Sequence, residues 1–349
     1  MKLGKFRLSK KSLNQLSNML EIRLKRSRLL SRPVFLTAEP TDACNSRCIM
    51  CNKRKLYCSP QFKPGFMSRE IFEKILPWAS YASSFCWGGF GEPFLHPSYA
   101  DWAEDLKDSG AKLLCFTNAI SLKKELAEKL VKIQFDNIVI SIGGATAKTY
   151  KYIRGVNGFH SMLENLAYLN AVKAAHNSAL PVIDFNLVAM NTVLPELNDV
   201  IRLAHEHKVR SVAMPDLNLQ YEENVQESIW NNMDEARKYI ESAQLLAGKL
   251  GVGLVPPTLD EKKGDCRDFF SLIQIAYDGT VLSCPMEKYT LGSLKHETLS
   301  RIWNKAEYRK LRKSYFKEGL CVTCPHCVEW DKSRTAMLRF SVDLRAESK

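Results

Sequence analysis

The strongest constraint on the fold is an alternation of strand-like and helix-like segments that begins at Pro33. Short apolar or β-branched runs predict strands over residues 34–37, 84–87, 112–117, 137–141, 182–189 and 211–215. Amphipathic periodicity predicts helices between them, over residues 68–80, 99–109, 123–133, 161–175 and 195–206. Strands that alternate with helices form parallel sheets with right-handed crossovers. The pattern therefore predicts an α/β fold, a partial, open (β/α)6 TIM-like barrel.

Three cysteines follow the first predicted strand with the spacing Cys44-x3-Cys48-x2-Cys51. Thiolates are soft ligands that suit iron-sulfur clusters, and three of them can hold three irons of a 4Fe-4S cluster while the fourth iron stays open. A structural zinc site normally closes with four ligands, and no partner pair lies near these cysteines. A cluster is the favoured interpretation, and zinc is the alternative.

Polar or glycine-rich segments follow the next three predicted strands. They are Gly88-Gly89-Phe90-Gly91-Glu92-Pro93, then Thr117-Asn118, then Ser141 to Ala145 with Arg154 beyond. In a barrel of this kind the ligand sites lie at the carboxyl ends of the strands. These segments are therefore expected to meet around one ligand.

Five more cysteines lie in the last third of the chain. Cys266-x12-Gly279-x4-Cys284 contains a predicted hairpin that turns on Asp278-Gly279, and Cys321-x2-Cys324-x2-Cys327 follows it. Five thiols suffice for one 4Fe-4S cluster, whereas two clusters need about eight. Cys266 and Cys284 are the favoured ligands, completed by Cys321 with Cys324 or by Cys324 with Cys327. Zinc is again the alternative.

From Pro33 to about Trp330, these segments resemble the radical SAM superfamily, in its SPASM/twitch branch with a single auxiliary 4Fe-4S cluster. The resemblance implies that the open iron of the first cluster binds S-adenosylmethionine (SAM), and that an electron cleaves SAM to a 5'-deoxyadenosyl radical, which abstracts hydrogen from a substrate. It also implies a SAM-binding set: Met50, Gly91, Glu92, Asn118, Ser141, Arg154 and Val188.

Within this set the resemblance implies separate roles. Glu92 and the glycine-rich turn would meet the ammonium group of SAM, Ser141 and Arg154 its ribose and carboxylate, and Met50 would pack near adenine. The sequence departs from the family pattern at two positions, since Ala119 stands where glycine is usual and Gly143 where aspartate is usual.

The three remaining cysteines have different expected roles. Cys86 and Cys115 fall in predicted strands and are expected in the core. Cys58 follows the cluster loop, and we predict it as a candidate catalytic thiol that donates hydrogen to a substrate radical, as an epimerase needs.

The N-terminal segment carries most of the net positive charge. Residues 1–33 contain ten basic side chains and the single acid Glu21, a net charge of +9 out of +12 for the chain. Leu13, Leu16, Leu20 and Leu24 predict an amphipathic helix, with Ser9 or Ser12 as its N-cap. Such a helix could bind an anionic membrane surface, an acidic partner or nucleic acid. The alternative is a solvated helix whose leucines pack on the domain.

The predicted organisation has four parts: a basic extension (1–32), the radical SAM barrel (33–250), an auxiliary-cluster domain (251–335) and a tail (336–349). A long helix over 227–250 and a strand over 252–255 are expected to bridge the two domains. The sequence has no apolar run near 18 residues and no secretory segment, which predicts a cytoplasmic protein, peripheral to the membrane if the N-terminal helix binds lipid.

The predicted function is a radical SAM oxidoreductase that dehydrogenates a small molecule such as a sugar or aminocyclitol, with the auxiliary cluster as electron acceptor. A flavodoxin- or ferredoxin-type protein is the expected electron donor. One alternative is a maturase or epimerase of a peptide, although the 32 residues before Pro33 are too few for the leader-binding domain that many maturases carry. An alternative of another class is a non-catalytic iron-sulfur or zinc nucleic-acid-binding protein. No recognition helix accompanies the basic charge, so nucleic acid is the less favoured partner.

Overall fold

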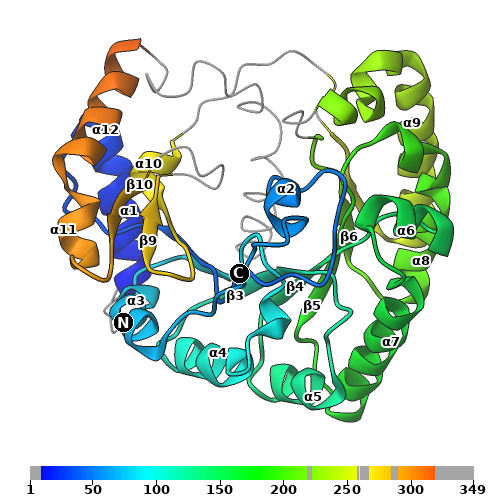
Figure 1. Ribbon diagram of the computed structural model, residues 1–349, viewed down its shortest axis with the longest axis horizontal. Helices are drawn as coiled ribbons and strands as arrows, with labels where there is room; N and C mark the ends of the chain where they lie inside the picture. Colours follow the sequence, from blue (N-terminus) through cyan, green and yellow to red (C-terminus); the bar gives the residue numbers. More distant parts are fainter. Residues whose placement is uncertain (1–8, 218–221, 258, 260–266, 284–289, 319–349) are drawn as a thin grey trace, which may run out of the picture.

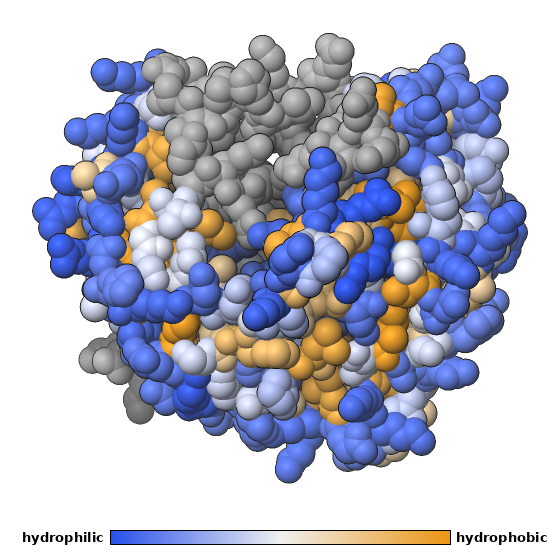
Figure 2. All heavy atoms as spheres, viewed as in Figure 1, coloured by the Kyte–Doolittle hydropathy of each residue, from blue (hydrophilic) through white to orange (hydrophobic). Residues whose placement is uncertain are grey.

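The computed structural model of the 349-residue chain describes residues 9–217, 222–257, 259, 267–283 and 290–318. A curved sheet forms its centre, and helices line the outer side of the curve (Figure 1). In the same view the outer rim is mostly hydrophilic, and hydrophobic residues show mainly in the middle of the face (Figure 2).

The first six strands pair in chain order and are all parallel. They are β1 (Phe35–Ala38), β2 (Ser84–Trp87), β3 (Leu113–Thr117), β4 (Asn137–Ser141), β5 (Val182–Asn186) and β6 (Ser211–Ala213). Each lies within the predicted run or within one residue of it, so the partial (β/α)6 barrel is confirmed. The expected run 182–189 outlasts its strand, because the chain leaves the sheet after Asn186.

The crossover helices also lie where their periodicity predicts them. They are α3 (Arg69–Ala79), α4 (Tyr99–Asp108), α5 (Lys124–Lys132), α7 (Phe159–Ala175) and α8 (Leu197–Glu206). Shorter elements connect the strands and helices: α2 (Arg54–Tyr57), η1 (Pro93–Leu95), α6 (Ala147–Arg154) and η2 (Asn191–Glu196). Aromatic packing beneath β2 closes the core, with the Phe72 and Trp102 rings stacked 4.7 Å apart and the Trp87 and Tyr99 rings 5.9 Å apart.

The single helix expected over 227–250 is wrong in its first part. The chain forms two 3-10 turns, η3 (Glu222–Glu227) and η4 (Ile229–Asn232), and then α9 (Met233–Leu250). Ser228 is extended, and its hydroxyl accepts a hydrogen bond from the Trp230 N–H as an N-cap, which stops a continuous helix there. The strand expected next is β7 (Gly253–Val255), which pairs in parallel with β6.

The C-terminal hairpin extends the same sheet at its other edge. Strands β8 (Leu272–Ile275) and β9 (Thr280–Leu282) turn on Asp278-Gly279 as expected, with Gly279 at φ +84°. β9 pairs with β10 (Thr290–Ser293), and β8 pairs in parallel with β1. The strand order is β10-β9-β8-β1-β2-β3-β4-β5-β6-β7. The boundary expected between residues 250 and 251 stays a prediction, and one continuous sheet crosses it.

Helices on the side of β8 to β10 complete the described structure. They are α1 (Lys10–Arg23), α10 (Asp268–Ser271), α11 (Leu299–Trp303) and α12 (Ala306–Glu318). The buried Arg312 guanidinium lies 4.3 Å from the Trp303 ring and donates to the Phe269 carbonyl, which ties α12 to α10 and α11. None of the helices in the described residues is both long and apolar enough to cross a membrane.

The predicted N-terminal helix is present, but its leucines face solvent and not the domain. Ser9 is the N-cap of α1, and its hydroxyl accepts from the Ser12 N–H, 3.1 Å away. The buried residues of α1 are Asn14, Asn18 and Glu21, whereas the predicted leucines are about half exposed or more. The alternative in which those leucines pack on the domain is therefore wrong.

Candidate functional site

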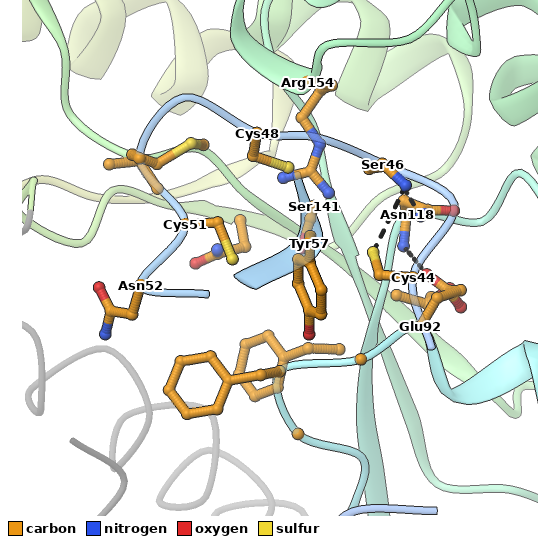
Figure 3. A pocket seen from close by; sticks show the side chains of 18 residues that line it. Cys44, Ser46, Cys48, Cys51, Asn52, Tyr57, Glu92, Asn118, Ser141 and Arg154 are labelled. Carbon is orange, nitrogen blue, oxygen red and sulfur yellow. Dashed lines mark hydrogen bonds between the residues drawn. The ribbon is translucent and has the colours of Figure 1, made fainter. Parts of the chain in front are cut away.

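The carboxyl ends of the first five strands surround a cavity of about 300 Å³ (Figure 3). The three loop cysteines and all seven residues expected to bind SAM lie on its wall. The lining residues are Cys44, Ser46, Cys48, Met50, Cys51, Asn52, Tyr57, Gly89, Phe90, Gly91, Glu92, Phe116, Thr117, Asn118, Ser141, Arg154, Asn186 and Val188. The segments that the sequence marked separately thus meet around one space.

The cysteine loop that follows β1 is held against the end of α6. The Arg47 N–H donates to the Arg154 carbonyl at 2.9 Å, and the Ile49 N–H donates to the Ile153 carbonyl at 3.0 Å. The Arg47 guanidinium donates to the carbonyls of Cys44 and Ser46, each 2.8 Å away. The main chain that carries the thiols is therefore fixed by the protein itself.

The three thiols are partly exposed on the cavity wall. Burial raises the pKa of Cys44 to about 11 and that of Cys51 to about 12. Both thiols are therefore protonated at neutral pH until a bound metal displaces the proton. No three His, Cys, Asp or Glu side chains among the described residues could hold a single metal ion together. Three cysteine thiolates on one loop can each bind one iron of a 4Fe-4S cluster, whereas a structural zinc site takes four ligands.

Glu92 braces the turn after β2 from within the protein. Its carboxylate is 2% exposed and accepts hydrogen bonds from the Thr117 hydroxyl at 2.6 Å, the Asn118 N–H at 2.7 Å and the Phe94 N–H at 3.2 Å. Burial raises the pKa of this carboxyl group. Both carboxylate oxygens already have donors, so Glu92 joins the β2 turn to the end of β3. The expected contact of its carboxylate with the SAM ammonium stays a prediction.

Glu39 is a brace that the sequence analysis missed. It directly follows β1 and is 2% exposed, and its carboxylate accepts from the Phe90 N–H at 2.6 Å and the Gly91 N–H at 3.2 Å. An acid between the first strand and the cysteine loop was its only signal in the sequence. A Cβ atom at Gly91 would lie 2.1 Å from the Thr41 carbonyl oxygen, so only glycine fits this approach of two backbones.

Asn118 joins β3 to the cysteine loop. It is 2% exposed, and its side-chain amide donates to Asn45 Oδ1 at 2.7 Å and to Ser46 Oγ at 3.0 Å. Ala119, where glycine is usual, adopts φ +57°, a left-handed backbone that accounts for the family preference. Asn118 therefore contributes to the cavity wall mainly by positioning the loop that carries the cysteines.

Arg154 ends α6, a helix that the sequence analysis did not predict. Thr146 caps its first turn and Gly155, at φ +69°, ends it; both are ordinary cap signals. Figure 3 shows the guanidinium directed toward Cys48 and Ser141. Its Nε is buried and has no hydrogen-bond partner among the described residues.

Arg154 is charged at neutral pH although it is buried. Burial lowers the pKa of the guanidinium, but Cys48, Tyr150 and Cys44 raise it by more, so the net shift is upward. A fixed cation on the cavity wall suits the carboxylate of SAM, which a guanidinium can hold through two parallel hydrogen bonds. A Cβ atom at Gly143 would lie 2.7 Å from Arg154 Cγ, so the missing aspartate leaves room for the arginine stem.

Other expected residues fall outside the cavity or outside the described chain. Cys86 and Cys115 are buried in the core, as predicted. Cys58 is exposed and is not among the cavity-lining residues, so its catalytic role stays a prediction. Five cysteines lie outside the described residues: Cys266, Cys284, Cys321, Cys324 and Cys327.

Tyr57 and Asn186 also line the cavity, and the sequence analysis predicted neither of them. The Tyr57 hydroxyl is buried and has no hydrogen-bond partner within the described part of the chain. Asn186 is the last residue of β5. Neither belongs to a motif, and only the meeting of strand ends brings them to this wall.

Arg154→Lys is expected to weaken SAM binding about 10- to 100-fold, because lysine keeps the charge but loses the planar fork that holds a carboxylate bidentately. The iron content should not change. Calorimetric titration of the anaerobically reconstituted protein with SAM measures this. Lys151→Gln, on the exposed side of the same helix, is the matched control. Wild-type affinity in Arg154→Lys would show that the guanidinium does not hold SAM.

Comparison with known proteins identifies the class. Residues 38–204 match the radical SAM superfamily, and residues 266–328 match the SPASM iron-sulfur cluster-binding domain. The chain belongs to the radical SAM superfamily, in the branch that carries a SPASM domain. Its cofactors are accordingly a SAM-binding 4Fe-4S cluster, SAM itself and auxiliary iron-sulfur binding in the C-terminal domain.

Three relatives show how this chain compares with individual proteins. A tungsten-containing aldehyde ferredoxin oxidoreductase cofactor-modifying protein of Pyrococcus furiosus is 22% identical over 84% of this chain and 86% of its own. Mycofactocin maturase MftC of Mycobacterium tuberculosis is 30% identical over 142 residues, which are 40% of this chain and 35% of MftC. Streptococcus suis SuiB, solved with its precursor peptide SuiA, superposes with a TM-score of 0.67 at 16% identity, covering 86% of this chain and 71% of SuiB. The likeness to SuiB shows the fold.

Proposed function

We propose that this radical SAM enzyme oxidises a peptide substrate and passes the second electron of the oxidation to an auxiliary cluster in its SPASM domain. The observation that carries the proposal is the convergence of Cys44, Cys48 and Cys51 with Arg154 on one cavity at the strand ends. The family supplies the class of chemistry. The substrate and the role of the second cluster are proposals.

Different residues of the cavity wall are assigned to different parts of the cofactors. We assign the three thiols to the 4Fe-4S cluster and Arg154 to the SAM carboxylate. Ser141 is assigned to the ribose, and Met50 and Val188 form the apolar part of the wall. Glu39, Glu92 and Asn118 hold the surrounding turns in place through the hydrogen bonds described above. The three thiols would hold a cluster that, when bound and reduced, would supply the electron for cleavage of SAM, while Arg154 would hold the SAM carboxylate in place.

A peptide is favoured over the sugar or aminocyclitol expected from the sequence. The maturase relative has the highest identity of the three, although it is matched over less than half of either chain. Isotope transfer decides between the two substrate classes. Deuterated synthetic peptides from a candidate library, but not deuterated aminocyclitols, should pass deuterium into 5'-deoxyadenosine. Transfer from an aminocyclitol alone would replace the peptide proposal and leave the radical SAM assignment intact.

The enzyme is tested against the non-catalytic alternative by anaerobic reconstitution. With dithionite and SAM, the protein should form 5'-deoxyadenosine, and a flavodoxin- or ferredoxin-type protein should replace dithionite. Tight binding to DNA or RNA with no SAM cleavage at full iron content would instead support a nucleic-acid-binding protein.

The double variant Cys266→Ala/Cys284→Ala is expected to keep some uncoupled 5'-deoxyadenosine formation and to lose the oxidised product, because the substrate radical then lacks its electron acceptor. Liquid chromatography of both products measures the split. Five cysteines can fill every iron position of one auxiliary cluster, so no open iron is expected there. Hyperfine coupling between a labelled substrate atom and that reduced cluster would overturn the acceptor role in favour of substrate ligation.

A further inference from the structure

Helix α1 presents an apolar surface to solvent. Leu13, Leu16 and Leu20 are 49%, 47% and 51% exposed, and they share one side of the helix. Six of the eleven large hydrophobic side chains that are exposed among the described residues lie between positions 13 and 30. The α1 apolar surface consists of Leu13, Leu16, Met19, Leu20 and Leu24. Single exposed leucines are ordinary, but a contiguous group marks an interaction site.

Polar side chains fix the opposite side of α1 on the domain. The Asn14 amide donates to the Arg32 carbonyl at 3.0 Å, and the Asn18 amide donates to the Phe270 carbonyl at 2.6 Å. The Glu21 carboxylate accepts from two backbone N–H groups, 2.6 and 3.1 Å away, in the segment after the helix. Turning the leucines inward would break these buried hydrogen bonds and leave their groups unsatisfied. The outward direction of the leucines is therefore built into the fold.

The exposed charged side chains of residues 9–33 are all basic. Arg23, Lys25, Arg26 and Arg28 are exposed at and just beyond the end of the helix. Glu21, the single acid among residues 1–33, is buried against the domain, 5% exposed. Leucines beside unopposed basic groups are complementary to a layer with an anionic surface and an apolar interior.

We propose that the α1 apolar surface and its adjacent basic residues dock this enzyme on an anionic lipid membrane. The leucines enter the boundary between head groups and acyl chains, while the arginines and lysine pair with lipid phosphates and carboxylates. A second copy of the chain fits this surface less well, because the exposed charges at both ends of α1 are basic, so two such helices would bring like charges together in either orientation.

Vesicle sedimentation of the full-length reconstituted protein tests the proposal. The probes are phosphatidylcholine vesicles with about one third phosphatidylserine, and vesicles of phosphatidylcholine alone. The wild type should bind the anionic vesicles, bind neutral ones less, and lose affinity as salt rises. Leu16→Gln/Leu20→Gln should lower the affinity about tenfold or more. Arg23→Gln/Arg26→Gln should lower it and weaken its salt dependence.

The matched control is Leu245→Gln, a leucine of α9 that is 70% exposed. It should bind vesicles as the wild type does, and all variants should keep their iron and their SAM cleavage. Equal binding by wild type and Leu16→Gln/Leu20→Gln would overturn the proposal. A wild-type dimer in light scattering that dissociates in this double variant would also overturn it. Binding of a purified acidic protein at α1, with no vesicle binding, would do the same.

Discussion

With Cys44, Cys48 and Cys51 all replaced by alanine, the reconstituted protein is expected to hold about four irons per chain instead of about eight, and to form no 5'-deoxyadenosine. These thiols line the cavity together and are the ligands that we assign to the SAM-binding cluster. We assign the remaining iron to the auxiliary cluster, whose predicted cysteine ligands lie more than two hundred residues further along the chain. Iron analysis and anaerobic product assays measure both effects.

Cys58→Ala is the control for that triple variant, because Cys58 is exposed and lies outside the cavity lining. It should keep about eight irons and normal SAM cleavage. Normal cleavage with loss of the final product in Cys58→Ala would support its predicted role as a hydrogen donor. Full iron in the triple variant, or stoichiometric zinc in the wild type, would contradict the assignment of two clusters.

Gly91→Ala is expected to destabilise the protein by about 3 kcal/mol or more and to weaken SAM binding at least about tenfold. The added methyl group would lie 2.1 Å from the Thr41 carbonyl oxygen and 2.9 Å from that of Ala43, and neither backbone atom can swing aside. The turn after β2 would have to separate from the cysteine loop, breaking the hydrogen bond from the Glu92 N–H to the Ala43 carbonyl. Thermal denaturation and SAM titration measure the two losses.

Gly248→Ala makes the same chemical change on the exposed side of α9, where the new methyl group meets no atom within 4 Å. It should be neutral or stabilise the protein by up to about 1 kcal/mol, since alanine is the better helix former. Equal stabilities for the two variants would mean that the turn and the cysteine loop are not packed as closely as Gly91 indicates.

The elements of the barrel could be predicted because their signals are local. An apolar run such as residues 137–141 coincides with β4, and the periodic segment at 123–133 contains α5. The pairing of β8 with β1 could not be predicted in this way. Phe35 and Leu272 are partners in register across more than two hundred residues, and neither local sequence specifies the other.

The site residues with chemical motifs could be predicted, and their supports could not. Spacing marks the three loop cysteines, whereas nothing near Glu39 in the sequence says that its carboxylate will receive the N–H groups of Phe90 and Gly91. The α1 helix shows the same limit. Periodicity predicts the helix. Which side of it faces the domain depends on hydrogen-bond acceptors far away in the sequence, such as the Phe270 carbonyl.

Gly143 and Arg154 constrain each other as a pair. A side chain at position 143 would occupy the space of the Arg154 stem, so the aspartate usual in the family could enter this protein only if that stem took another path. The two positions are therefore epistatic. Gly143→Asp alone should lower the free energy of unfolding more than the same change made together with a shorter residue at 154. The effect of a substitution at position 143 therefore depends on which side chain stands at position 154.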